Sequence, residues 1–236
     1  MSQKNLIELR DVVKTYGMKE AQVQVLKGAS ACISQGEKCV LFGPSGSGKS
    51  TILNLIGGLE SLDSGEILFQ DQPITSFNKS QLVDYRRQNL GFIFQFYNLI
   101  PDLTIKENIE VGAYISKDPL SVDELLENLG LKDQRNKFPR QVSGGQQQRC
   151  DVARALVKNP KLLLCDEPTG ALDYKTSKEM LGLLDKINAD YGCTMIIVTH
   201  NQAIAPLCNH VLSLRDGIFC EDIYNEEVLS AEEISW

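Results

Sequence analysis

The chain has 236 residues, of which 42% are hydrophobic and 23% charged, a globular composition that excludes a disordered or fibrous protein. Its formal net charge of −7 argues against a nucleic-acid partner, because phosphate backbones favour basic surfaces. Residues 1–10 lack the apolar core of a signal peptide, and no apolar run approaches the ~20 residues that span a bilayer. We therefore expect one compact domain that does not cross a membrane by itself.

The cysteines indicate a reducing compartment. There are seven, an odd number without a CxxC pair, and several lie in apolar runs such as KLLLCDEP. We expect reduced and mostly buried thiols in a cytosolic protein. A zinc site stays open but gains little support, because His200 and His210 are the only histidines of the sequence and no ligand spacing accompanies them.

The first third of the chain predicts strands separated by turns. The runs LIELRDVV, QVLKGASACIS and GEKCVLFG are typical of strands, and KSTILNLIGGL carries apolar residues at helical spacing. Residues 61–75 predict a turn, a strand and a second turn, and LGFIFQ at 90–95 predicts another short strand. The segment GPSGSGKS at 43–50 therefore joins a strand to a helix.

The middle of the chain, at about 96–159, changes to helical patterns. They occur in TIKENIEVGAY, SVDELLENLG and QQQRCDVARALVKN, separated by glycine and proline, and suggest a helical insertion. After Pro160 strands are predicted in KLLLCD, TMIIVTH and VLSLRDG, with a helix at about 174–190. The acidic tail from Glu221 is predicted to form a short terminal helix.

This alternation of strands and helices predicts an α/β fold. Its core would be a mostly parallel sheet covered by helices on both faces. Ligands of such sheets bind at the carboxyl ends of the strands, so the segments that follow the strands are the first place to look for a site.

GPSGSGKS matches a phosphate-binding loop. Gly43, Gly48, Lys49 and Ser50 satisfy the pattern G-x-x-x-x-G-K-[ST] between a strand and a helix. Glycines let successive backbone N–H groups face one anion, and the helix N-terminus adds about half a positive charge. Lys49 would reach the β and γ phosphates of a nucleoside triphosphate, and Ser50 would ligate Mg²⁺. The alternative is a glycine-rich turn that matches by chance.

Two further segments suggest partners for this loop. In LLLCDEP a strand ends in two carboxylates, Asp166 to hold Mg²⁺ and Glu167 to polarise an attacking water, although such a pair could also cap a helix. In VSGGQQQRCDVARAL, Ser143 and Gln146 fit a capping box, and two glycines leave backbone N–H groups exposed. We interpret this second segment as another anion site, the alternative being an ordinary capped helix.

Together GPSGSGKS, VSGGQ, LLLCDEP, ALD at 171–173 and His200 resemble the motifs of an ATP-binding cassette (ABC) ATPase, the nucleotide-hydrolysing subunit of ABC transporters. The resemblance covers about residues 5–220. It implies a P-loop NTPase fold with an N-terminal antiparallel β subdomain beside the mostly parallel core sheet. It also implies one domain over 1–236, divided into a catalytic core at about 1–95 and 160–220, a helical subdomain with the VSGGQ signature at about 96–159, and a short acidic tail at 221–236.

The resemblance implies roles for individual residues. Glu167 would be the catalytic base, His200 would contact the γ-phosphate, and Gln95 would sense Mg²⁺ and the attacking water. Lys49 completes the catalytic set, and Mg²⁺ would be held by Ser50, Gln95 and Asp166. Contacts to ATP are expected from Tyr16, Gly43, Ser45, Gly46, Ser47, Gly48, Lys49, Ser50, Thr51, Ser143, Gly144, Gly145, Gln146 and Asp173.

Within this set Tyr16 would stack on adenine and Asp173 would communicate between two sites. The resemblance further implies that Ser143, Gly144 and Gly145 of one subunit close over ATP bound to another. The working unit would then be a head-to-tail dimer with a second copy or a paralogous subunit. Without the resemblance, Tyr16 could be a plain surface aromatic, Gln95 the end of a strand and His200 a structural histidine.

RRQNLGFIFQFYNLIPDLTIKENI and DEPTGALDYKT are similar to the subgroup that serves bacterial lipoprotein-releasing, macrolide-exporting and peptide-antibiotic-resistance transporters. The partner implied is an integral membrane permease, which places the chain at the cytoplasmic face of the cell membrane. The alternative is a soluble cassette ATPase that acts as an assembly factor or chaperone. A nonhydrolytic regulatory cassette is disfavoured, because Glu167 and His200 are both present. The transported molecule is not encoded here, because specificity lies in the permease.

The segment FYNLIP at 96–101 is unusually apolar for a loop. We hypothesise that Phe96, Tyr97, Leu99 and Ile100 help line a groove that receives a short cytoplasmic helix of the permease. The alternative is that these side chains pack inside the helical subdomain, since apolar residues are more often core than contact.

Overall fold

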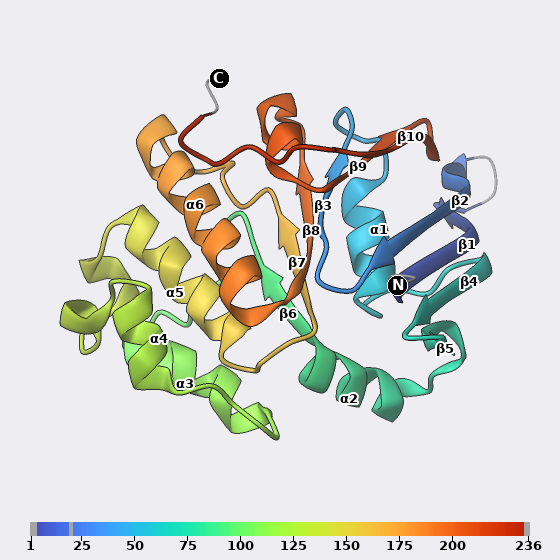
Figure 1. Ribbon diagram of the computed structural model, residues 1–236. Helices are drawn as coiled ribbons and strands as arrows, with labels where there is room; N and C mark the ends of the chain where they lie inside the picture. Colours follow the sequence, from blue (N-terminus) through green and yellow to red (C-terminus); the bar gives the residue numbers. More distant parts are fainter. Residues whose placement is uncertain (1–3, 19–20, 234–236) are drawn as a thin grey trace.

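Two β-sheets build the computed structural model, which describes residues 4–18 and 21–233 (Figure 1). The first sheet is antiparallel, in the order β2-β1-β4-β5. The second has the order β10-β9-β3-β8-β7-β6, with β9 to β6 parallel and β10 antiparallel. The strands are β1 (Asn5–Tyr16), β2 (Val23–Ser34), β3 (Lys38–Phe42), β4 (Ser64–Phe69), β5 (Gln72–Pro73), β6 (Leu90–Ile93), β7 (Leu162–Asp166), β8 (Thr194–Thr199), β9 (His210–Arg215) and β10 (Ile218–Tyr224). The predicted mostly parallel core sheet and antiparallel β subdomain are confirmed.

The helices flank the parallel sheet. They are α1 (Lys49–Ile56), α2 (Lys79–Asn89), α3 (Ile105–Ile115), α4 (Val122–Asn128), α5 (Gly144–Leu156) and α6 (Tyr174–Tyr191). Short 3-10 turns occupy Ile74–Ser76, Lys132–Gln134, Pro139–Gln141 and Gln202–Leu207. Figure 1 shows α3, α4, α5 and α6 on one side of the parallel sheet, with α1 and the antiparallel sheet on the other. Helix α2 was not predicted, because it carries no apolar stripe: Tyr85 is the one buried residue on that helix.

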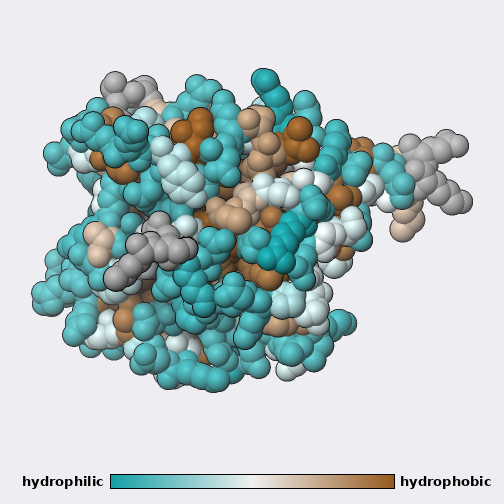
Figure 2. Space-filling view, turned by 45° about the vertical axis from the view of Figure 1, so that its right-hand side comes forward, coloured by the Kyte–Doolittle hydropathy of each residue, from teal (hydrophilic) through white to brown (hydrophobic). Residues whose placement is uncertain are grey.

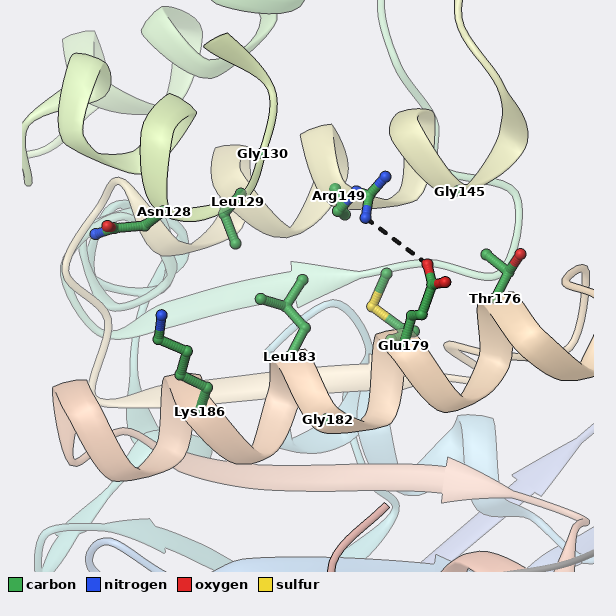
Figure 3. Close-up of a pocket in the computed structure, with 11 residues that line it drawn as sticks. Asn128, Leu129, Gly130, Gly145, Arg149, Thr176, Glu179, Gly182, Leu183 and Lys186 are labelled. Atoms are coloured by element: carbon green, nitrogen blue, oxygen red, sulfur yellow. Dashed lines mark ion pairs between the residues drawn. The ribbon is translucent and has the colours of Figure 1, made fainter. Parts of the chain in front are cut away.

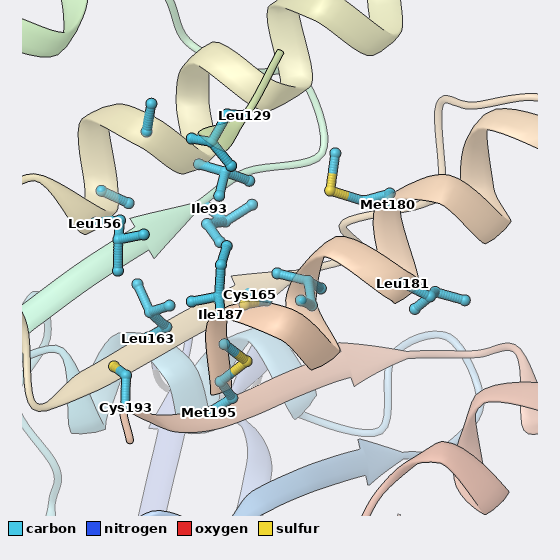
Figure 4. Packing of buried hydrophobic residues seen from close by; sticks show 14 of the residues in the cluster. Ile93, Leu129, Leu156, Leu163, Cys165, Met180, Leu181, Ile187, Cys193 and Met195 are labelled. Atoms are coloured by element: carbon cyan, nitrogen blue, oxygen red, sulfur yellow. The ribbon is translucent and has the colours of Figure 1, made fainter. Parts of the chain in front are cut away.

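Alternating side chains of the parallel strands enter two separate cores. Leu163 and Cys165 of β7 pack into the core beneath α5 and α6, which Figure 4 shows. Their neighbours Leu162 and Leu164 pack into the core between the sheet and α1. Because successive side chains of a strand point to opposite faces, both faces of the parallel sheet are buried. Each fully buried aliphatic side chain contributes roughly 1.5–3 kcal/mol to the stability of the fold.

Capping boxes fix where three helices begin. Asn78 and Gln81 exchange side-chain and backbone hydrogen bonds at α2, Thr104 and Glu107 do so at α3, and Ser143 and Gln146 do so at α5. Each side chain accepts a backbone N–H that the first turn leaves without a partner, which stabilises the helix by about 1 kcal/mol. The capping box predicted at Ser143 is therefore confirmed.

The acidic tail does not begin as a helix, so that prediction was wrong. Residues from Glu221 continue β10, which pairs with β9 through a two-residue hairpin turn at Asp216 and Gly217. Both turn residues have positive φ, 50° and 81°, as this hairpin turn requires. The Asp-Gly pair was the sequence signal for this strand. Residues 226–227 form a bend and 231–233 a turn, and 234–236 lie outside the described residues.

Most of the cysteine side chains are buried, as expected. Of the seven free thiols five are buried, Cys32 is half-buried and Cys220 is exposed. One group of potential metal ligands occurs among the described residues, with donor atoms of Glu37, Cys39 and His210 within 4.8 Å of one another. In the described part of the chain no helix is long and apolar enough to span a bilayer. Hydrophilic residues cover most of the face in Figure 2, where hydrophobic ones appear in separate patches.

Candidate nucleotide-binding site

The loop between β3 and α1 presents free backbone donors. Gly48 is the N-cap of α1, with φ 104°, and has no side-chain cap, so the first N–H groups of the helix are open to an anion. Gly46 also has positive φ, 79°. A Cβ at Gly43 would lie 2.3 Å from the carbonyl oxygen of Leu214, so this position admits only glycine without a rearrangement. The glycines thus shape a concave, positively polarised turn.

Lys49 lies under this turn. The residue is 8% exposed, and Nζ donates to the carbonyl oxygens of Gly43 at 2.8 Å and Pro44 at 2.9 Å. Burial lowers the pKa of Lys49, while the nearby carboxylates of Glu167 and Asp166 oppose that shift. Two carbonyl oxygens hold the Lys49 ammonium at the wall of an open cavity. A cation in that position can bind a polyanion that enters the cavity.

Ser50 of α1 and Asp166 at the end of β7 bring two hard oxygen atoms close together. The hydroxyl of Ser50 lies 3.4 Å from Oδ1 of Asp166. Burial raises the pKa of Asp166, and the hydrogen bond from Ser50 and the charge of Lys49 oppose that shift. A divalent cation would favour the ionised carboxylate, and oxygen donors are the ligands that Mg²⁺ prefers. The donor set therefore fits Mg²⁺.

Glu167 follows Asp166 and faces β8. Its backbone N–H donates to the carbonyl oxygen of Val198 at 3.0 Å. One carboxylate oxygen accepts from the hydroxyl of Thr199 at 3.2 Å, and the other lies 2.8 Å from Nδ1 of His200. Its side chain is 17% exposed, whereas that of His200 is 69% exposed. The sequence indicated these two residues separately, and the structure places them in contact.

A cavity of about 390 Å³ connects these groups, a volume within the range of ligand sites. It is lined by the predicted residues Ser45, Gly46, Gly48, Lys49, Ser50, Thr51, Asp166, Glu167 and His200, and by the unpredicted Val25 and Val198. Gly43 and Ser47 belong to the same loop without lining the cavity. In the described structure the buried hydroxyl of Ser47 has no hydrogen-bond partner.

Two predicted residues lie beside the cavity. Tyr16, at the end of β1, has its hydroxyl 3.5 Å from Oγ1 of Thr51 and also donates to Glu60. Gln95 follows β6 and packs against the turn after Glu167. Its Nε2 is so close to Gly170 that a Cβ at that glycine would lie only 2.9 Å away. Neither residue lines the cavity, so their contact with a ligand stays a prediction.

The VSGGQ signature lies elsewhere on the molecule. Ser143 accepts from the N–H of Gln146 at 3.3 Å, and Gln146 accepts from the N–H of Ser143 at 3.0 Å. None of the residues 143–146 lines the cavity of the phosphate loop. Asp173, at the start of α6, accepts from the N–H of Thr176 at 3.0 Å and does not line it either. Within one chain these predicted residues therefore form a second, separate set.

Gly145 lines a different cavity, of about 410 Å³, between α5 and α6 (Figure 3). A Cβ at Gly145 would lie 2.7 Å from a methyl carbon of Thr176, so α5 and α6 approach each other closely there. Across this cavity Arg149 of α5 and Glu179 of α6 form an ion pair of 3.9 Å. This cavity contains no residue of the phosphate loop.

Comparison with known proteins agrees with this geometry. A family model described as ABC transporter matches residues 26–170. The macrolide export ATP-binding/permease protein MacB of Escherichia coli is 42% identical over 217 residues, covering 90% of this chain and 33% of that protein. A homologue, in Mycoplasma pneumoniae, of the ABC transporter ATP-binding protein MG065 is 41% identical over 237 residues, covering 99% of this chain and 51% of that protein. The chain thus spans about half the length of these curated relatives, or less.

A solved structure shares the whole architecture. The ATP-binding cassette MJ0796, a dimer in a post-hydrolysis state bound to ADP and Pi, superposes with a TM-score of 0.83. It is 38% identical and covers 92% of this chain and 98% of that one.

Proposed function

Because the chain belongs to the ABC transporter family and is an ABC-type ATPase cassette, we propose that it hydrolyses ATP to power a separate integral membrane permease. The family resemblance drawn from the motifs is confirmed, and a relative named for macrolide export supports the subgroup. The observation that carries the proposal is the contact of Glu167 with His200 on the wall of the cavity that also holds the phosphate loop.

The phosphate loop would bind the triphosphate of ATP. The free N–H groups at the start of α1 and the ammonium of Lys49 would neutralise the phosphate oxygens. Ser50 and Asp166, with Gln95, would hold Mg²⁺, which would supply positive charge to neutralise the charge that develops on the phosphates. Their 3.4 Å separation supports the first two as ligands.

Glu167 would act as the general base. Its carboxylate would take a proton from water as the water oxygen attacks the γ-phosphorus and ADP leaves, giving ADP and phosphate. Nδ1 of His200 fixes one carboxylate oxygen, and Thr199 fixes the other. The second ring nitrogen of His200 would then face the γ-phosphate.

The separate position of the signature supports a dimer. Ser143, Gly144 and Gly145 do not line the phosphate-loop cavity of their own chain. We infer that they close over ATP bound to a second copy, or to a paralogous subunit, in a head-to-tail pair. In that arrangement the N-terminus of α5 would supply backbone donors to the γ-phosphate.

A groove beside β6 is the proposed docking site for the permease. It has a volume of about 330 Å³ and is lined by Phe92, Phe94, Asn98, Val111, Gly112, Ile115, Arg154, Ala155 and Lys158. The residues predicted to line it do not do so: this set is Phe96, Tyr97, Leu99 and Ile100. In the adjoining loop Phe96 is 75% exposed and Ile100 is 40% exposed, whereas Leu99 packs on the helical core, as the core-packing alternative expected. An apolar groove with cationic side chains suits a short amphipathic helix. Binding there would hold the chain at the cytoplasmic face of the membrane.

Phosphate release by the purified chain tests the proposed activity. We expect hydrolysis of ATP that requires Mg²⁺ and stops when EDTA is added. A folded chain that binds ATP but releases no phosphate, alone or with its permease, would contradict the proposal. Co-purification with an integral membrane protein tests the proposed partner, and recovery of soluble assemblies alone would favour an assembly factor.

A further inference from the structure

Tyr16 is tied by hydrogen bonds to the helix that begins at the phosphate loop. Its hydroxyl donates to one carboxylate oxygen of Glu60 and lies 3.5 Å from Oγ1 of Thr51. The other carboxylate oxygen of Glu60 accepts from Nδ2 of Asn54 at 2.8 Å. Because Thr51 and Asn54 both belong to α1, the tyrosine ring has a fixed position relative to the phosphate cradle.

The turn that contains Glu60 also holds the strand immediately before Tyr16. Nζ of Lys14 donates to the carbonyl oxygen of Ser61 at 2.6 Å and lies 5.1 Å from the centroid of the Tyr16 ring. The backbone N–H of Thr15 donates to Asp63 at 2.6 Å. One face of the ring therefore has a cationic neighbour, and Tyr16 remains 38% exposed. An exposed aromatic ring that is fixed in this way offers a preorganised surface on which a planar ring can stack.

The phenol of Tyr16 is protonated at neutral pH and donates to Glu60, because its ordinary pKa of about 10 is raised further by burial and by that hydrogen bond. Without the carboxylate, the ring would be free to occupy other rotamers, and ordering it on binding would cost conformational entropy. Glu60 itself is half-buried and does not line the cavity.

We propose that Glu60 is a positioning residue for recognition of the nucleotide base, acting through the hydroxyl of Tyr16. It sets where the tyrosine ring stands above α1, so that adenine stacks on it while the phosphates occupy the loop. This inference rests on the proposed function, because the role of Tyr16 toward adenine comes from the family resemblance. The geometry on which it stands is the chain of contacts from Asn54 through Glu60 to Tyr16.

Calorimetric affinities for ATP and for inorganic tripolyphosphate, which has no base, test the proposal. We expect Glu60→Ala to weaken ATP binding about fivefold to tenfold, the cost of ordering one freed side chain on binding, and to leave tripolyphosphate binding unchanged. In hydrolysis assays KM for ATP should rise by the same factor while kcat stays unchanged. Glu60→Gln should restore most of the affinity, because its amide oxygen still accepts from the tyrosine.

Two further variants separate positioning from support of the fold. Glu66→Ala removes a carboxylate that pairs with Arg10 in the same subdomain, and we expect it to leave both affinities unchanged. Tyr16→Phe should lose as much ATP affinity as Glu60→Ala, and the double variant should lose no more than either. If Glu60→Ala does not fold, Tyr16→Phe makes the same comparison, because it removes only the hydroxyl.

Three results would overturn the inference. Unchanged ATP affinity in Glu60→Ala or Tyr16→Phe would show that the hydrogen bond positions nothing. An equal loss for ATP and tripolyphosphate would show that Glu60 supports the phosphate loop instead. A wild-type chain that binds both ligands equally would show that the base is not recognised. Failure of the proposed function is distinguishable, since a chain that binds ATP without hydrolysing it leaves the affinity comparison intact.

Discussion

Glu167 and His200 meet because their strands are neighbours, with Nδ1 of His200 2.8 Å from Oε1 of Glu167. The register of β7 and β8 pairs Asp166 with Val198, so the residues that follow each strand emerge together. Glu167 has a φ of 48°, a left-handed conformation that costs a residue with a side chain roughly 1 kcal/mol or more. The fold holds this conformation where the carboxylate faces the nucleotide cavity.

Replacing this carboxylate should stop chemistry without stopping binding. We expect Glu167→Gln to lower kcat by roughly 10²- to 10⁴-fold, because the amide cannot take a proton from water, while ATP affinity changes little. Phosphate release and calorimetry measure the two effects. Glu179→Gln, which alters a carboxylate outside the phosphate-loop cavity, should keep normal hydrolysis. Near wild-type turnover in Glu167→Gln would assign the base to another group.

Lys49 should contribute to binding itself. The ammonium is buried under the phosphate loop. Its loss would remove the proposed charge-assisted hydrogen bonds to phosphate, each worth roughly 1.5–3 kcal/mol. We expect Lys49→Ala to weaken ATP binding by about 10- to 100-fold in a calorimetric titration. Lys79→Ala, at an exposed lysine of α2, is the control. Unchanged affinity in Lys49→Ala would remove the phosphate-loop assignment.

His210 joins the terminal hairpin to the core through two carboxylates. The ring is fully buried, Nδ1 contacts Glu37, and Nε2 lies 2.8 Å from Oδ1 of Asp222 in β10. Tyr224 stacks on the imidazole with ring centroids 4.2 Å apart, and the Cys39 thiol lies nearby. Burial alone would lower the pKa of His210, but the hydrogen bonds of Glu37 and Asp222 outweigh it and raise the pKa.

This arrangement predicts that alkaline pH destabilises the fold. Because the pKa of His210 is higher in the folded than in the unfolded chain, protonation stabilises the fold fully below the unfolded pKa of about 6.5. That contribution is lost as pH rises through the folded pKa. Burial raises the pKa of Tyr224 to about 12 and that of Cys39 well above its usual value, so neither titrates in this window.

Denaturant unfolding between pH 6 and pH 9 would test this prediction. We expect the free energy of unfolding to fall with pH above about 6.5 in the wild-type chain, and the slope to be smaller in His210→Gln. A slope that is the same in both chains would mean that His210 is not the group responsible.

The phosphate loop and the strand-end carboxylates could be predicted because their signals are local. GPSGSGKS combines a spacing with a strand and a helix on either side, and Asp166 ends an unbroken apolar run. The contact of Glu167 with His200 could not be predicted, because it depends on the order β3-β8-β7 in the sheet. The hydrogen bond between Tyr16 and Glu60 joins residues that are 44 positions apart and has no local pattern.

Helix α2 and strand β10 escaped prediction for different reasons. Helix α2 buries a single residue, so it has no apolar stripe for a periodicity argument to detect. The β10 strand has an exposed, acidic sequence, and its strand conformation depends on pairing with β9. The Asp-Gly pair at the turn is the local signal that favours this strand.

The loop beside the β6 groove is held in place by side chains of two helices. Arg154 donates to the carbonyl oxygens of Asn98 at 2.7 Å and Tyr97 at 2.8 Å, so the loop beside the groove is fixed to α5. Asn108 of α3 holds the same loop through the N–H of Ile100 at 2.8 Å. A permease helix in this groove would therefore contact a rigid surface that is connected to the signature helix.

Ile115 is the probe for this surface, because it lines the groove and is 47% exposed, so a charge there should not disturb the core. We expect Ile115→Glu to retain ATP hydrolysis by the isolated chain but to lose assembly with the permease, since the carboxylate would face apolar surface. The matched control is Ile218→Glu, whose isoleucine is also 47% exposed but lies on β10. Pull-down with the permease and phosphate release measure both properties in parallel. Normal assembly of Ile115→Glu, or equal loss in both variants, would place the docking surface elsewhere.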